Sequence, residues 1–386
     1  MQRPSKPFRK GTGIIKRNKS CFPAGVFHDM GGYPVHMPPV KRSKGPYLYD
    51  YDENRYVDFD LSCGSLLLGH APAVLCSTVK SWLGRGYASG YPVVSHEMLS
   101  GGMRQALKCG EKGGSWLFYN SPFEAGGAAA YLLKRYWKRD RGLRLSSPGL
   151  LMRLSPFSGI NERLLITEEI NDSSFLNTDF VVLRVGRSRE TGRVEDLVGR
   201  IKEEGLMVVS DETDFGGHVH MSHGTDITDM LDMRVFGSFL SSGLPFGCIF
   251  IGESLMKRIS APKDYETFTD IASFSYSVPL YTMKTVIRYL GELQKQGGIE
   301  RVLQKAEFFY SMLDGTGFEL EGGLVYLKEV PGLKEGYQKL RLLLLNNGFY
   351  FPLYAGDPIA VSLAHSDELL KKCAGEVNAL LKKYIQ

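Results

Sequence analysis

Several common features are missing from this sequence, and each absence excludes a class of protein. The six cysteines contain no C-x-x-C pair, which excludes the spacing of common zinc and redox motifs. No segment recurs at a fixed period, which excludes repeat architectures. The net charge is only +5 over 386 residues, so we expect no nucleic acid partner.

Export and membrane signals are also missing. The first twenty residues hold seven lysines and arginines and no acid, but the apolar core of a signal peptide does not follow them. This segment indicates a solvated basic arm, with a transit peptide as the alternative. Residues 235–252 are uncharged, but their glycines, serines and Pro245 favour a buried strand–loop–strand over a membrane span. We expect a cytoplasmic protein with reduced, mostly buried cysteines and no membrane partner.

The clearest structural signal is a short apolar run that ends at an acid. Residues 206–209 are Leu, Met, Val and Val, and Asp211 follows them. Such a run predicts a strand buried on both faces, as in a parallel sheet. An acid just past its carboxyl end points to the crevice where open α/β sheets bind ligands. Val235 and Phe236 predict the next strand, which leads into a loop rich in Gly and Ser.

The remaining elements follow from periodicity. Alternating apolar residues around a turn at 52–54 predict a hairpin over residues 47–59. Further strands are expected at 116–119 and 181–183, and helices at 73–84, 96–109, 122–136, 194–204, 253–260, 281–296 and 298–313. Residues 137–179 are rich in Gly, Ser and Pro and predict a loose connection.

A series of motifs occurs in a specific order along the chain. They are K-G-x-Y-L-Y-D-x-D-x-N-R-Y-x-D at 44–58, G-H-A at 69–71, D-E at 211–212, a glycine-rich G-S-F-L-S-S-G-L-P-F-G block at 237–247 and S-L-A-H-S-D at 362–367. In this order they resemble the class III (fold type I) aminotransferases that use pyridoxal phosphate, above all glutamate-1-semialdehyde aminomutase. The match covers residues 21–136 and 180–386.

The resemblance implies an architecture. We expect an α/β protein with a mostly parallel central sheet flanked by helices and a small α+β C-terminal domain. The corresponding segments are an N-terminal arm and hairpin at 1–60, a large domain at 61–285 and a small domain at 286–386. The resemblance also implies a homodimer, because the neighbouring subunit completes each cleft in this family.

The same resemblance assigns the cofactor positions and shows what has changed. The family places the acid of its D-E motif against the pyridine nitrogen and a lysine second in its glycine-rich block; these are Asp211 and Ser238 here. The family reads N-S-G-T-E-A where this chain has N-S-P-F-E-A, and its phosphate-binding threonine from the second subunit corresponds to Phe274. Its stacking aromatic has no counterpart within 137–179. The vestigial cofactor set is therefore Ser121, Pro122, Phe123, Asp211, Ser238 and Phe274.

These substitutions remove the chemistry of a transaminase. Ser238 has no amine to form an imine, Pro122 has no N–H for a phosphate, and Phe123 is apolar where a hydroxyl is needed. We therefore expect no catalytic residue and no bound cofactor, with pyridoxal phosphate implied by resemblance only. The leading hypothesis is a pseudoenzyme that serves as a binding or scaffold protein, or as the silent partner of an active paralogue.

Other interpretations of these residues remain open. The cleft could support a different chemistry with Asp211, His218 or His220 as acid–base groups, or an aminotransferase reaction through Lys257 or Lys263. A zinc site is the least favoured alternative; it would use residues His218, His220, His223, Asp214 and Asp226. A purely structural interpretation is the remaining alternative. In it, Asp211 is an acid at the end of a strand, Glu124 is an acid in the first turn of a helix, and residues 241–243 form an ordinary turn. His70 and His365 then have structural roles.

Overall fold

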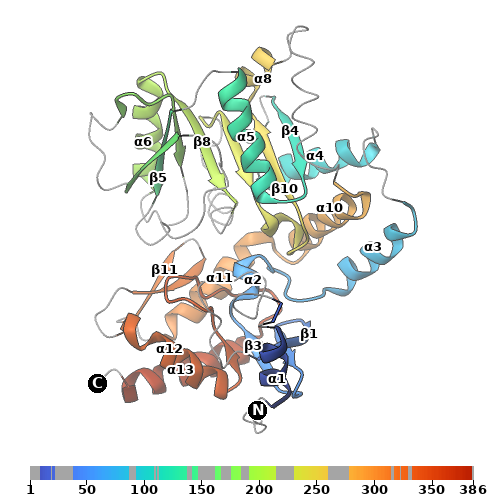
Figure 1. The fold of residues 1–386 in the computed structure, drawn as a ribbon, viewed down its shortest axis with the longest axis vertical. Coiled ribbons are helices and arrows are strands. Elements are labelled where there is room, and N and C mark those ends of the chain that lie inside the picture. Colours follow the sequence, from blue (N-terminus) through green and yellow to red (C-terminus); the bar gives the residue numbers. More distant parts are fainter. Residues whose placement is uncertain are drawn as a thin grey trace. The chain divides into compact units, whose positions relative to one another are not determined.

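In the computed structural model, which describes most of the chain, the protein forms two compact units (Figure 1). Unit 1 comprises Met1–Pro72, Val302–Leu320 and Leu324–Gln386, and unit 2 comprises Ala73–Arg301 and Glu321–Gly323. The predicted boundaries at residues 60 and 285 remain predictions. The described residues are 9–18, 20–21, 38–86, 93–107, 110, 113–136, 141–146, 161–166, 175–183, 191–213, 230–259, 278–313, 317–321, 323–328 and 333–384.

Unit 2 is built on a seven-stranded sheet with the order β4-β10-β9-β8-β7-β5-β6. Strands β9, β8, β7, β5 and β6 run parallel, whereas β10 is antiparallel to both β9 and β4. The sheet is therefore mostly parallel, as predicted. Its strands are β4 (Ser115–Tyr119), β5 (Arg141–Ser146), β6 (Asn161–Ile166), β7 (Phe180–Leu183), β8 (Met207–Glu212), β9 (Met233–Phe236) and β10 (Gly247–Ile251).

Helices cover both faces of this sheet (Figure 1). On one face α5 (Pro122–Tyr136) and α8 (Glu253–Ile259) pack against Val209 and its neighbours, and on the other α6 (Thr191–Glu203) packs against Val208. Side chains alternate along a strand, so adjacent residues of β8 enter different cores. Burial on both faces explains why the central strands are continuous apolar runs in the sequence.

Three further helices of unit 2 pack together. They are α3 (Ala73–Leu83), α4 (Val94–Leu107) and α10 (Leu280–Lys295), and α10 contacts both of the others. The buried side of α10 includes Met283, Val286 and Leu290, which recur with helical spacing. α10 also contacts the short 3-10 helix η4 (Ser238–Ser241), and so supports the loop after β9.

Unit 1 combines the two ends of the chain. Its main sheet has the order β1-β2-β3-β13, where β1 to β3 are antiparallel neighbours and β13 is parallel to β3. Its apolar core is rich in aromatic rings, and Phe59 stacks on Phe309 with ring centroids 5.2 Å apart. The elements are β1 (Val40–Lys44), β2 (Tyr47–Asp50), β3 (Arg55–Asp58), α2 (Leu61–Gly64), α11 (Gly298–Ser311, in unit 1 from residue 302), β11 (Phe318–Glu321), β12 (Leu324–Leu327), α12 (Leu333–Asn346), β13 (Phe349–Tyr350) and α13 (Asp367–Tyr384).

The turn of the predicted hairpin is organised by Asp50. Its buried carboxylate accepts hydrogen bonds from the backbone N–H groups of Asp52 and Asn54, at 2.9 and 2.8 Å, and from the side chains of Asn54 and Tyr56. One carboxylate thereby satisfies four donors, which fixes the turn and the register of β2 against β3. The D-x-D-x-N-R-Y spacing of the sequence is explained by these bonds.

Three sequence predictions differ from the structure. The segment 137–179 contains β5 and β6, so the loose connection expected there is wrong for residues 141–146 and 161–166. The basic arm is not simply solvated, because Arg9–Asn18 forms helix α1 and Ile15 on it is buried. The cysteines are not mostly buried either: of the five that the structure describes, Cys21 and Cys63 are exposed and only Cys248 and Cys373 are buried.

Helix α1 forms because unit 1 caps it. The backbone N–H groups of Lys10 and Gly11 donate to the two carboxylate oxygens of Asp52, at 3.1 and 3.0 Å. A carboxylate at a helix N-terminus satisfies unpaired donors and stabilises the helix dipole. The uncharged stretch 235–252 forms β9, η4 and β10, as predicted. Among the described helices, none is long and apolar enough to cross a membrane.

Candidate functional site

The candidate site lies at one edge of the unit 2 sheet. Because β4, β8 and β9 run in the same direction and β10 runs against them, the ends of the first three and the start of β10 share this edge. We call it the carboxyl edge. Two glycines show how tightly it is packed: a Cβ on Gly237 would lie 1.9 Å from the Thr213 carbonyl oxygen, and one on Gly247 would lie 2.4 Å from that of Ser121.

Asp211 lies at the end of β8 and is 2% exposed. Its Oδ1 accepts hydrogen bonds from the hydroxyl and backbone N–H of Thr213, at 2.6 and 3.2 Å. Its Oδ2 is buried and has no hydrogen-bond partner among the residues that the structure describes. A buried carboxylate oxygen without a donor is costly and uncommon in folded proteins. Asp211 therefore has a strong acceptor that no described residue uses.

The adjacent acid, Glu212, has the opposite environment. It points to the other face of the sheet and is fully buried in a two-point ion pair with Arg234 of β9. The Arg234 Nε and Nη2 atoms donate to its two oxygens at 2.6 and 2.7 Å, and the guanidinium lies 4.8 Å from the Phe236 ring centroid. The sequence analysis missed this pair, although an arginine inside the otherwise apolar strand β9 is a signal for a buried acid.

Ser238 begins the 3-10 helix that follows β9, and its side chain lies outside the described part of the structure. The parallel register pairs Asp211 with Val235 and Glu212 with Phe236, so the backbone of Ser238 follows directly beside the end of β8. The turn after it is local: the Ser241 hydroxyl donates to the Leu244 carbonyl oxygen at 2.6 Å. The Ser242 hydroxyl is buried and has no partner among the described residues.

The start of α5 is held by a capping box. The Ser121 hydroxyl accepts the backbone N–H of Glu124 at 3.1 Å, and the Glu124 carboxylate accepts that of Asn120 at 3.0 Å. The Ala125 N–H donates to the Ser121 carbonyl oxygen. These bonds take up two N–H groups of the first turn, and Pro122 supplies none. The Phe123 side chain is 59% exposed, so the start of the helix offers few donors for an anion.

Several predicted residues are not part of this arrangement. Lys257 lies on α8, where its exposed amine forms an ion pair with Glu253 at 3.0 Å. Among the described residues, no group of three or more His, Cys, Asp and Glu side chains could hold a metal ion. The remaining candidates lie outside the described residues: Phe274, Lys263, Asp214, His218, His220, His223 and Asp226.

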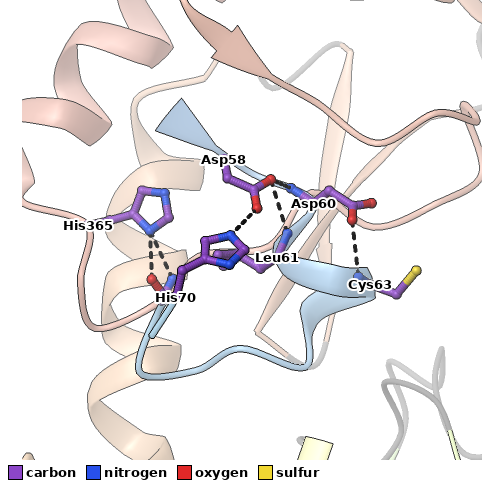
Figure 2. Close-up of polar contacts among 7 residues, drawn as sticks. Asp58, Asp60, Leu61, Cys63, His70 and His365 are labelled. Carbon is purple, nitrogen blue, oxygen red and sulfur yellow. Dashed lines mark hydrogen bonds and ion pairs between the residues drawn. The ribbon is translucent and has the colours of Figure 1, made fainter. Parts of the chain in front are cut away.

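His70 belongs to a separate polar group in unit 1, which also contains Asp58, Ser362 and His365 and which we call the Asp58 cluster (Figure 2). The buried Asp58 carboxylate contacts the His70 Nε2 at 2.7 Å and accepts the backbone N–H groups of Asp60 and Leu61. These bonds precede α2, whose residues 61–64 have φ values of 49°, 54°, 56° and 74°. A left-handed turn of this kind is unfavourable for L-residues, so Asp58 helps to hold it in place.

His365 of the Asp58 cluster is buried beside the Phe59 ring. Its Nδ1 accepts the Ser362 N–H at 3.2 Å and contacts the Ser362 hydroxyl at 2.9 Å (Figure 2). Its Nε2 has no partner in the part of the chain that the structure describes. Burial lowers the pKa of His365 to about 4, against the smaller opposing effect of Asp58. The imidazole is therefore neutral at physiological pH, which fits the structural role predicted for both histidines.

Comparisons with known proteins agree with this geometry at the level of the fold. No protein-family model matches the chain. The glutamate-1-semialdehyde 2,1-aminomutase of Thermoplasma acidophilum is 25% identical over 93% of this chain and 96% of its own. An omega-transaminase from Sphaerobacter thermophilus superimposes with a TM-score of 0.77 at 15% identity, over 99% of both chains. The chain has the fold type I aminotransferase fold. Together these likenesses support an aminotransferase-like family.

A further solved structure bears on the cofactor. It is a lysine-to-alanine variant of a glutamate-1-semialdehyde-aminomutase from Pseudomonas aeruginosa PAO1 in complex with PMP. It superimposes with a TM-score of 0.71 at 17% identity, over 95% of this chain and 94% of that chain. PMP is the amine form of the cofactor, so that complex contains a ligand that needs no lysine aldimine.

The carboxyl edge fits one part of such a cofactor and not the others. The unused Oδ2 of Asp211 suits a protonated ring nitrogen. The first turn of α5 does not suit a phosphate, because Pro122 has no N–H and two N–H groups are bonded to Ser121. Ser238 provides a hydroxyl, which does not condense with an aldehyde to give an imine.

Proposed function

We propose that this chain is an aminotransferase-like protein that does not form an imine with pyridoxal phosphate and acts as a binding or scaffold subunit. The observation that carries the proposal is Ser238. Its backbone follows β9 beside the end of β8, where Asp211 lies. This geometry supports Ser238 as the counterpart of the lysine in the resembling family. A residue at this position that lacks an amine removes both the covalent link to the cofactor and the base that moves the proton.

The start of α5 supports the same proposal independently. A phosphate at a helix N-terminus depends on several unpaired N–H groups and on the helix dipole. Here Pro122 removes one donor, the capping box of Ser121 and Glu124 occupies others, and Phe123 adds no polar atom. The loss of the amine and of the phosphate donors is therefore coordinated, which favours a change of function over a single inactivating substitution.

We further propose that the chain acts as a homodimer or as the silent partner of an active paralogue. Support comes from the family resemblance, in which the neighbouring subunit completes each cleft. A subunit that no longer reacts can still supply surface to its partner. Light scattering on the purified chain is expected to give twice the monomer mass of 43.1 kDa. A strictly monomeric chain that also fails to associate with an aminotransferase would contradict this part of the proposal.

The absence of imine formation is tested by an absorbance spectrum of the chain after addition of pyridoxal phosphate. The natural chain is expected to give the spectrum of the free aldehyde, and a Ser238→Lys variant to give an aldimine band. The variant is the matched control, because it restores an amine at the position in question and leaves Asp211 unchanged. A stoichiometric aldimine band from the natural chain would contradict the proposal, and its loss in Lys257→Ala or Lys263→Ala would identify the lysine that reacts.

Binding of PMP is a separate outcome of this experiment. PMP carries its own amine, so it tests the ring and phosphate contacts without the imine. Retention of PMP by the natural chain, with loss of binding in Asp211→Ala, would identify the bound ligand of the pseudoenzyme. No binding of either form would indicate a scaffold role. Turnover of an amino donor by the natural chain would overturn the proposed function itself.

A further inference from the structure

Positive charge is concentrated at one end of the chain. Residues 1–55 contain eleven lysines and arginines and four acids, whereas residues 56–386 contain 36 lysines and arginines and 38 acids. The positive net charge of the whole chain therefore comes from the N-terminal segment alone. The expectation of no nucleic acid partner rested on the average charge over 386 residues, which conceals this asymmetry. The described part of the segment, with α1, β1 and the hairpin, belongs to unit 1.

Folding also buries two of the three acids that the structure describes in this segment. The Asp50 carboxylate is buried within the hairpin turn, and that of Asp52 caps α1. Glu53 is exposed, but Lys41 contacts it at 2.5 Å. The hydrogen bond from Lys41 is the main cause of a lowered Glu53 pKa, and the charges of Arg42 and Lys10 add to it. Among the described acids of this segment, the one exposed acid is thus close to cations of α1 and β1.

The exposed cations are ordered across the sheet. The register places Arg42, Tyr49 and Arg55 in one row across β1, β2 and β3. The Arg42 guanidinium lies 3.6 Å from the Tyr49 ring centroid, and that of Arg55 lies 4.6 Å from the ring centroid of Tyr47. Stacking on an aromatic ring restricts a guanidinium without neutralising it. These arginines are therefore held in place with their charge available.

We define the basic face as Lys10, Lys41, Arg42, Lys44 and Arg55, all of which are exposed. Charges on an edge strand such as β1 also prevent sheets from pairing edge to edge. That role accounts for lysines on β1. It does not account for Arg55, which lies on an interior strand, or for Lys10, which lies on a helix.

We propose that the basic face binds single-stranded nucleic acid. Stacked guanidinium groups donate to phosphates and offer a flat surface to bases, and Tyr51 at the tip of the hairpin adds a ring that is 41% exposed. A membrane is a poorer partner, because the apolar side of α1 is used inside unit 1, where Ile15 is buried. An acidic protein is also poorer, because a protein interface requires an apolar centre that the five cations do not provide.

The proposal is tested by fluorescence anisotropy with the full chain and a labelled 20-nucleotide oligouridine. We expect saturable binding that weakens with salt, with a slope of log affinity against log salt of about −3.5 for five phosphate contacts. Arg42→Gln with Arg55→Gln is expected to weaken binding at least tenfold. Arg42→Lys with Arg55→Lys keeps the charge but loses the flat stacked group, and an intermediate loss is expected.

A matched control has the same change in charge elsewhere in unit 1. Lys372 and Lys382 are exposed on α13, and Lys372→Gln with Lys382→Gln is expected to change the affinity less than twofold. If the arginine variants do not fold, Lys41→Gln with Lys44→Gln serves instead. An equal loss in the α13 control would overturn the proposal. So would equally tight binding of a polyglutamate peptide or of anionic vesicles at the same salt, or no binding of the oligonucleotide by the natural chain.

Discussion

The carboxyl edge and the Asp58 cluster each contain a buried carboxylate at the end of a strand, but the two acids differ in their hydrogen bonds. Both oxygens of Asp58 are bonded, one to His70 and the other to backbone N–H groups. Asp211 uses one oxygen for Thr213 and leaves the other without a donor. Both motifs are equally prominent in the sequence. Only the structure separates an acid that holds the fold from an acid with unused bonding capacity.

The difference bears on the proposal that the carboxyl edge no longer reacts with a cofactor. A buried acceptor without a donor lowers stability. The presence of such an oxygen beside Ser238 fits the proposal of an edge that was built for a ligand. In the Asp58 cluster the Asp58 carboxylate is explained by the left-handed turn that it supports, whereas the buried Nε2 of His365 has no partner among the described residues.

The largest expected effect concerns the ion pair behind Asp211. Arg234→Met leaves the Glu212 carboxylate buried without the guanidinium that neutralises it, and we expect a loss of about 4 kcal/mol in the free energy of unfolding. Urea denaturation provides the measurement, and Arg288→Met on the exposed side of α10 is the control, with an expected change below about 0.5 kcal/mol. Equal effects of the two substitutions would show that the buried pair does not hold β8 against β9.

The next largest expected effect is a pH dependence of the free energy of unfolding, which is caused by His365 of the Asp58 cluster. The pKa of His365 is about 4 in the folded chain and about 6.5 when unfolded. Between these values the unfolded chain binds more protons than the folded chain. The contribution of the neutral His365 to the free energy of unfolding is therefore complete above about pH 6.5 and is lost as the pH falls towards 4. We expect a loss of about 3 kcal/mol over this range. In His365→Gln the dependence should be reduced by that amount; an unchanged profile would contradict the assignment.

The comparison between Asp58 and Asp211 is tested by replacing each of them with asparagine. Asp58→Asn removes charge from bonds to His70 and two N–H groups, and an unfolding free energy about 2 kcal/mol lower is expected. Asp211→Asn removes a charge that is only half bonded, and the expected change lies within about 1 kcal/mol of zero in either direction. Thermal denaturation of the two variants side by side decides the matter. An Asp211 variant that is the less stable of the two would reverse the account.

The parts of the fold that depend on local pattern were predictable. The hairpin at 47–59, the buried strand ending at Asp211 and the strand–loop–strand after residue 235 were all found from alternation, apolar runs and turn residues. β5 and β6 were missed because their arginines, serine and asparagine resemble a loop when read without their neighbours in the sheet. α1 was missed because its cap, Asp52, lies more than 40 residues away along the chain.

The candidate site was also only partly predictable from the sequence. Its positions follow from motifs, so Asp211, Ser121 and the block from Gly237 to Gly247 could be located from the sequence. The bonding of each group depends on contacts between distant segments and could not. Neither the free Oδ2 of Asp211 nor the pair of Glu212 with Arg234 is encoded in a local pattern.

The central claim is that the chain does not capture an aldehyde cofactor covalently. Intact-mass spectrometry after incubation with pyridoxal phosphate and reduction with borohydride tests this directly, with the Ser238→Lys variant treated in parallel. The account predicts an unmodified mass for the natural chain and one added phosphopyridoxyl group, mapped to position 238, for the variant. A single stoichiometric adduct on the natural chain would contradict it.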